Sequence, residues 1–153
     1  MIRASKAHAF LAKLDALLVD AEDPAALAVR LLAETLPHYR WVGIYWLTGD
    51  TLMLGPYVGA PTEHERIPVG RGVCGTAITQ GKNQIVPDVR LLSNYLACSV
   101  ETRSEIVVLI RHGGKIVGQI DVDGHEPGAF DATDEALLTA VAQRLAQAFG
   151  PRA

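Results

Sequence analysis

The hydrophobic period of the chain changes at Trp41, and this change constrains the fold more than any other feature. Before it, apolar residues recur at helical spacing over residues 5–19 and 24–36, and Asp23 followed by Pro24 is typical of a helix start. After it, residues 41–47 and 51–58 are rich in aromatic and branched side chains, which are typical of strands. The sequence therefore predicts two helices followed by a β-hairpin.

The rest of the chain extends this sheet and ends in another helix. The clearest hairpin spans residues 105–111 and 115–122, with shorter strands predicted at 67–69 and 83–86. A short helix is predicted from Gly72 to Gln80 with Gly81 as its end, and Asp131 would cap the last helix. We therefore expect an α+β domain whose terminal helices cover one face of a mostly antiparallel sheet.

Size and charge exclude several classes of protein. A chain of 153 residues most simply forms one domain, and its net charge of −3 argues against nucleic acid as a partner. No apolar run is long enough to span a membrane, and Lys13 and Asp15 interrupt the early apolar stretch that a signal peptide would need. Two cysteines are too few for a secreted disulfide framework, so we expect a cytoplasmic protein.

Both cysteines lie in stretches predicted to be loops or loop ends. Cys74 follows two closely spaced glycines, Gly70 and Gly72, at the start of the short predicted helix, where the helix dipole favours a thiolate. Cys98 lies in a long predicted loop over residues 87–99, and long loops are often functional. Each cysteine is either a small core residue or a reactive thiol, and a pair of reactive thiols could form a reversible disulfide. We expect the two loops to meet over one small pocket.

Three carboxylates lie near one end of the later hairpin. Glu105 begins its first strand, and strand alternation points Asp121 and Asp123 to one face of the second strand. The plainer interpretation is a solvated strand end. The functional one is an anionic pocket for an ammonium group, in which crowding and burial raise one pKa enough for that acid to donate a proton.

Other candidates carry weaker signals. Trp41 and Tyr45 share one face of a strand, either as core residues or as an aromatic wall for a small apolar group. His64 has no second histidine or cysteine at ligand spacing, so no zinc site is predicted. The glycines around Arg71 lack the strand context of a dinucleotide-binding loop.

Taken together, the motifs resemble those of a known family. The strings are WVGIY at 41–45, LGPY at 54–57, RIPVGRGVCGT at 66–76, AC at 97–98, SEIVV at 104–108 and GQIDVD at 118–123. They occur in the order and nearly the spacing of the free methionine-(R)-sulfoxide reductases, which are single-domain proteins of the GAF fold. The resemblance implies one GAF-like domain over residues 1–153, with its motifs at about 41–123.

The resemblance also implies roles for these residues. Cys98 matches the catalytic cysteine and Cys74 a resolving thiol. The pocket would be lined by the acids and the aromatic wall, which are Glu105, Asp121, Asp123, Trp41 and Tyr45. The implied activity is thiol-dependent reduction of free L-methionine-(R)-sulfoxide to L-methionine, through a sulfenic acid on Cys98 and a Cys74–Cys98 disulfide. Glu105 or one of the aspartates would donate the proton, a thioredoxin-like protein would reduce the disulfide, and no metal or organic cofactor would be needed.

One departure from the family concerns the connection between the second and third predicted strands. Many members carry a third cysteine where this chain has His64, and the connection over residues 59–66 is one residue longer here. Family members in which that third cysteine acts as the resolving thiol therefore cannot guide the interpretation of this chain. A ligand-binding GAF sensor and a thiol redox sensor remain alternatives. The oligomeric state stays open, with a homodimer among the options.

Overall fold

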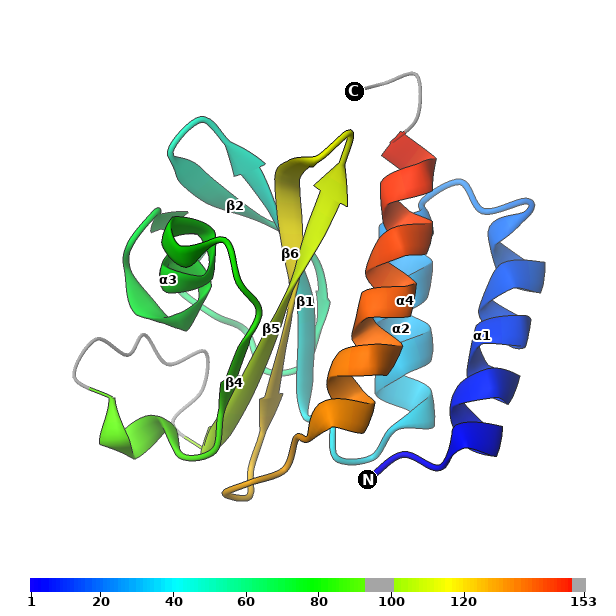
Figure 1. Cartoon of the computed structure of the whole chain (residues 1–153), viewed down its shortest axis with the longest axis horizontal. Helices are drawn as coiled ribbons and strands as arrows, with labels where there is room; N and C mark the ends of the chain where they lie inside the picture. The colour runs from blue at the N-terminus through cyan, green and yellow to red at the C-terminus, as the bar shows by residue number, and fades with distance from the viewer. Residues whose placement is uncertain (93–100, 150–153) are drawn as a thin grey trace.

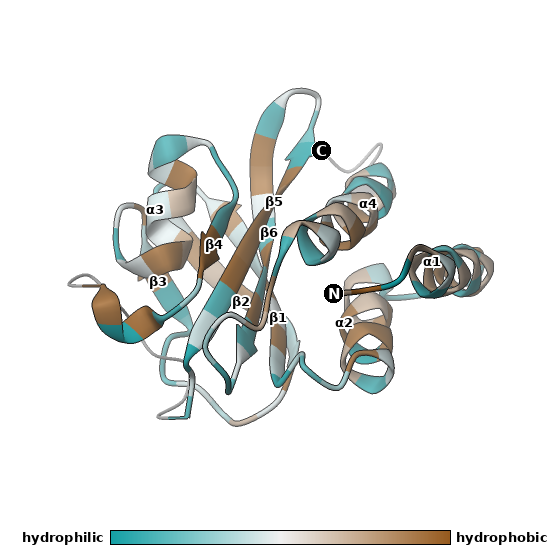
Figure 2. Ribbon diagram, turned by 60° about the horizontal axis from the view of Figure 1, so that its bottom comes forward, coloured by the Kyte–Doolittle hydropathy of each residue, from teal (hydrophilic) through white to brown (hydrophobic). Residues whose placement is uncertain are grey.

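The computed structural model describes residues 1–92 and 101–149, with the side chain of the last of these residues left out (Figure 1). Six strands form one antiparallel sheet in the order β3-β2-β1-β6-β5-β4. Helices α1, α2 and α4 lie on one side of this sheet and α3 lies on the other, as Figure 2 shows. The α+β architecture, with the terminal helices on one face, is confirmed.

The strands follow the predicted pattern closely. Their bounds are β1 Trp41–Thr48, β2 Thr51–Val58, β3 Arg66–Pro68, β4 Gln84–Val86, β5 Ser104–His112 and β6 Lys115–Gly124. Gly49 and the Gly113–Gly114 pair have positive φ angles of 63°, 58° and 78° at the two hairpin turns, a conformation that glycine adopts without strain. Both predicted hairpins are therefore present, and the glycines explain where the chain reverses direction.

The helices also begin and end where local signals indicate. Their bounds are α1 Ala4–Leu18, α2 Pro24–Thr35, α3 Gly72–Gln80 and α4 Ala132–Phe149, with a short 3₁₀ turn at Val89–Leu91. The Asp23 carboxylate accepts a hydrogen bond from the Ala26 amide at 3.1 Å, and Gly81 ends α3 in the left-handed conformation. None of the described helices is both long and apolar enough to span a membrane.

The main core lies between the sheet and the three helices on its first face. Alternate strand residues point into it, including Val42 and Ile44 of β1, and they pack against buried helix residues such as Leu14, Leu32 and Leu138. The same alternation sends the intervening strand residues to the opposite face. There they form, together with buried residues of α3, a second and smaller cluster: Trp41, Tyr45, Leu52, Ile67, Val73, Cys74, Ala77, Val107 and Leu109.

Candidate active site

Side chains on the second face form rows that cross three strands. In the register of β1, β6 and β5, Asp123 pairs with both Trp41 and Glu105, and Asp121 pairs with both Gly43 and Val107. Residues directly opposite one another on neighbouring strands share a face. The predicted placement of both aspartates on one face, next to Glu105, is confirmed.

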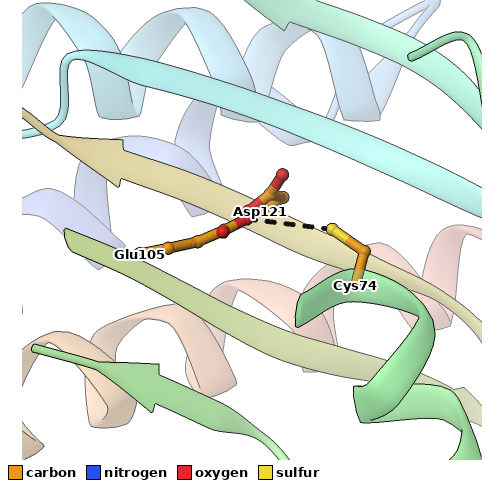
Figure 3. A group of neighbouring side chains, drawn as sticks. All are labelled: Cys74, Glu105 and Asp121. Atoms are coloured by element: carbon orange, nitrogen blue, oxygen red, sulfur yellow. Dashed lines mark hydrogen bonds between the residues drawn. The ribbon is translucent and has the colours of Figure 1, made fainter. Parts of the chain in front are cut away.

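Helix α3 brings Cys74 to this acidic group. The Cys74 Sγ lies 3.9 Å from Glu105 Oε2. The Sγ and one carboxylate oxygen each from Glu105 and Asp121 all lie within 4.8 Å of one another. Figure 3 shows the three side chains converging from α3, β5 and β6. Residues far apart in the sequence therefore form one buried cluster.

A close backbone approach fixes the start of α3. A Cβ atom on Gly75 would lie 2.8 Å from both the Pro68 carbonyl oxygen and the Gly70 nitrogen, which is too close for any other residue. The Gly70 amide donates a hydrogen bond to the Gly75 carbonyl at 3.0 Å, and the Gln119 Nε2 donates one to the Cys74 carbonyl at 3.0 Å. The glycine-rich motif thus packs the first turn of α3 against the segment that follows β3, and Gln119 ties the same turn to β6.

The description of Cys74 as loop sequence is wrong, whereas its predicted position at the start of a short helix is confirmed. The residue sits in the first turn of α3 rather than in a loop, and its exposed fraction is only 4%. It packs in the smaller apolar cluster while its sulfur faces the acids. Cys74 is therefore a small core residue, as one of the two interpretations predicted, and its reactivity as a thiol stays a prediction.

The interpretation of the three carboxylates as a solvated strand end is wrong. Glu105 has an exposed fraction of 2%, and Asp121 and Asp123 are fully buried. Burial raises the pKa of Glu105 well above its ordinary value of 4.5, and the negative charges of Asp121 and Asp123 raise it further. Glu105 can therefore hold a proton at a pH at which an exposed glutamate has lost it.

The two predicted aromatic residues are both buried and both tied to a neighbouring segment. Trp41 and Tyr45 stack with ring centroids 6.5 Å apart. The Trp41 Nε1 donates to the Ala60 carbonyl at 3.0 Å, and the Tyr45 hydroxyl donates to the His64 carbonyl at 2.8 Å. Their rings pack in the smaller apolar cluster, and their polar ends hold the segment between β2 and β3 against β1.

Two site residues escaped the sequence analysis. Gln119 is fully buried and follows the same alternation as Asp121 and Asp123, a signal that was available in the sequence. Gly43 leaves room for the Trp41 indole, because a Cβ atom there would overlap the ring. No pattern in the sequence indicated that residue 43 must be small to leave room for the Trp41 ring.

The predicted catalytic residue Cys98 lies outside the described residues, which stop at 92 and resume at 101. The Cys74–Cys98 pairing therefore remains a prediction. The residues that the structure does bring together are Cys74, Glu105, Asp121, Asp123, Trp41 and Tyr45.

Comparisons with known proteins place the chain in a family. The family model described as "GAF domain" matches residues 20–149. The chain is 41% identical over 114 residues to the free methionine-R-sulfoxide reductase of Escherichia coli, covering 74% of this chain and 68% of that protein. It is also 41% identical over 143 residues to protein YtsP of Bacillus subtilis, covering 90% and 87% respectively.

A solved structure agrees in both fold and sequence. The free methionine-R-sulfoxide reductase of Neisseria meningitidis, determined in complex with its substrate, superposes with a TM-score of 0.87 at 33% identity, covering 97% of this chain and 93% of that one. Because fold, sequence identity and coverage agree, the chain belongs to the free methionine-R-sulfoxide reductase family of GAF-domain proteins.

Proposed function

We propose that this protein reduces free L-methionine-(R)-sulfoxide to L-methionine, with Cys98 as the nucleophile and Cys74 as the resolving thiol. The observation that carries the proposal is the buried acidic group of Glu105, Asp121 and Asp123 next to Cys74. The relatives named as reductases of this substrate supply the second support.

The acidic group suits recognition of a free amino acid. A free amino acid carries an ammonium group, which a methionine sulfoxide within a peptide chain lacks. Buried carboxylates are costly when they face one another, and a ligand cation offsets that cost. The rings of Trp41 and Tyr45, on the same face, offer an apolar surface for the methyl and methylene groups.

The chemical step transfers the sulfoxide oxygen to a thiolate. The Cys98 thiolate attacks the sulfoxide sulfur while a carboxylic acid protonates the oxygen, which gives a transient S–S bond. The hydroxyl group then moves to the cysteine sulfur as the S–O and S–S bonds of the substrate sulfur break, and methionine leaves. The sulfoxide sulfur is reduced, and Cys98 is oxidised to a sulfenic acid. Glu105 is our candidate for the proton donor, because its raised pKa favours the protonated form.

The recycling steps restore the two thiols. The Cys74 thiol attacks the sulfenic sulfur, a Cys74–Cys98 disulfide forms, and water leaves. A dithiol protein of the thioredoxin type then reduces the disulfide by exchange and becomes oxidised itself. No metal or organic cofactor enters this scheme.

The test is an assay of methionine formation with three substrates side by side. Purified protein and a thiol reductant would receive free R-sulfoxide, free S-sulfoxide and a peptide-bound R-sulfoxide. We expect turnover of the free R-sulfoxide and little turnover of the other two substrates. Only the free R-sulfoxide has both the R configuration at sulfur and an ammonium group. Equal reduction of the peptide would contradict the role of the acids.

The same assay separates the two alternatives. A ligand-binding sensor would bind free methionine sulfoxide but release no methionine. A thiol redox sensor would oxidise its cysteines without consuming a sulfoxide. Steady formation of methionine over many equivalents of protein excludes both.

A further inference from the structure

The geometry points to a site for a thiophilic divalent cation such as Zn²⁺ or Cd²⁺, ligated by Cys74, Glu105 and Asp121. This inference goes beyond the proposed reaction, which needs no metal. The cysteine and carboxylate spacing in the sequence gave no sign of it, because the three donors belong to three separate elements, α3, β5 and β6.

The donor atoms already lie close to the separation that such a cation requires. Tetrahedral zinc holds sulfur at about 2.3 Å and oxygen at about 2.0–2.2 Å, which places neighbouring donors about 3.3–3.6 Å apart. The Cys74 Sγ to Glu105 Oε2 distance is 3.9 Å, and no pair among the three donors exceeds 4.8 Å. Small side-chain rotations would therefore close the site without moving the sheet.

An independent observation concerns Gln119. Its side chain is fully buried, and within the described part of the chain its Oε1 has no hydrogen-bond partner. Its Nε2 is bonded to the Cys74 carbonyl, which holds the amide beside the cluster. A buried acceptor of this kind is costly unless a ligand satisfies it. We therefore expect the cation, or a water bound to it, to satisfy this oxygen.

Charge also favours a cation at this position. Glu105 pairs directly with Asp123, and Asp121 lies two residues from Asp123 on the same face of β6, so a divalent ion would relieve repulsion among three acidic groups. Ligation requires the Cys74 thiolate and the ionised Glu105 carboxylate, so the protons of both groups leave to the solvent as the metal–ligand bonds form, and no electron is transferred. The sulfur donor selects zinc or cadmium over magnesium or calcium, which prefer oxygen alone.

A bound cation would occupy groups that the proposed function uses. It would hold the Cys74 sulfur and the carboxylates that face the substrate ammonium group. We therefore expect metal binding and sulfoxide binding to exclude one another.

The test is a titration of reduced, chelator-treated protein with Cd²⁺, followed by the ultraviolet charge-transfer absorbance of the thiolate–cadmium bond. We expect the wild-type band to saturate at one equivalent. Cys74→Ser should lose the band, whereas Cys98→Ser, the matched thiol control, should keep it. Circular dichroism would show that both variants remain folded.

Two carboxylate variants test the rest of the ligand set. Glu105→Gln and Asp121→Asn should each weaken Cd²⁺ binding by at least about tenfold, since each removes one anionic ligand. Glu126→Gln, an exposed acid elsewhere in the chain, should leave it unchanged. A band that survives in Cys74→Ser, that is lost in Cys98→Ser, or that is unaffected by both carboxylate variants would overturn the inference. Because no sulfoxide is present, failure here is distinguishable from failure of the proposed function.

Discussion

The two faces of the sheet are built by the same strands but serve different purposes. In β5, Ile106, Val108 and Ile110 enter the apolar core under the three helices, while Glu105 and its alternate neighbours face α3. The first face packs a mostly apolar core, and the second buries three acids beside a cysteine. Alternate strand residues thus contribute to stability on one face and to the proposed chemistry on the other, so one property can be changed with little effect on the other.

Two buried carboxylates make the contrast concrete. Asp134, on the helix side, accepts hydrogen bonds from the Tyr39 hydroxyl at 2.9 Å and the Asp131 amide at 2.9 Å, and its Oδ1 lies 2.7 Å from His38 Nε2. Glu105, on the site side, lies beside two other acids. Hydrogen bonds satisfy the Asp134 carboxylate, so it stabilises the fold. Glu105 instead lies against two other acids, an arrangement that favours binding of a proton or a cation.

The largest expected effect comes from substituting the two cysteines. Cys98→Ser should abolish even a single turnover, because it removes the proposed nucleophile. Cys74→Ser should still form one methionine per protein, leaving a sulfenic acid that a dimedone-type reagent traps. Quantifying methionine against protein without added reductant measures this difference.

Two results would contradict that assignment. One is full thioredoxin-dependent turnover by Cys74→Ser, which would require a different resolving route. The other is single turnover by Cys98→Ser but not by Cys74→Ser, which would mean that the two roles are exchanged.

Substitutions in the core under α1, α2 and α4 should change stability rather than activity. Leu138 is fully buried in the main core, so Leu138→Ala should lower the free energy of unfolding by about 2–5 kcal/mol. Urea denaturation measures this loss, with Leu91→Ala as the control, because Leu91 is 83% exposed. Activity per folded molecule should be unchanged, and a selective loss of kcat would break the separation of the two faces.

Glu105→Gln should act in the opposite sense on the two properties. Turnover should fall by about 10²–10⁴-fold if Glu105 is the proton donor. The free energy of unfolding should rise by about 0.5–2 kcal/mol, because the variant removes an acid crowded against two others. Unchanged turnover would transfer the proton-donor role to an aspartate.

The pH dependence of stability sharpens this test. The pKa of Glu105 is raised in the folded protein, so between its ordinary value of 4.5 and the raised value the folded state binds more protons than the unfolded state. The contribution of Glu105 to stability is therefore greatest below pH 4.5 and is lost as pH rises through that window. The stability difference between Glu105→Gln and wild type should grow with pH, and a pH-independent difference would count against burial of this acid.

The smallest effect is expected on the helix side, at Tyr39→Phe. This change removes one of several hydrogen-bond donors to Asp134, so the free energy of unfolding should fall by about 0.5–1.5 kcal/mol. Thermal unfolding measures the change, and reductase activity should not respond. A larger loss than that of Leu138→Ala would show that the polar cluster, rather than apolar packing, dominates this face.

Much of the site was predictable because strand alternation is a local property. The shared face of Asp121 and Asp123 follows from a period of two along β6, and the stack of Trp41 on Tyr45 follows from the same period along β1. Burial was not predictable in this way. Whether a strand end is solvated depends on which segments cover it. Glu105 is covered in part by α3, whose Cys74 lies 31 residues earlier in the chain.

The sequence by itself determined the order and type of the helices and strands, their caps and turns, and which residues alternate toward each face. These depend on backbone geometry and side-chain patterns within a few residues. Only the tertiary structure decided that Cys74, Glu105 and Asp121 meet in one buried cluster and that Gln119 lies beside them. Their distances depend on the register of β5 against β6 and on the seating of α3, which arise from packing between remote segments.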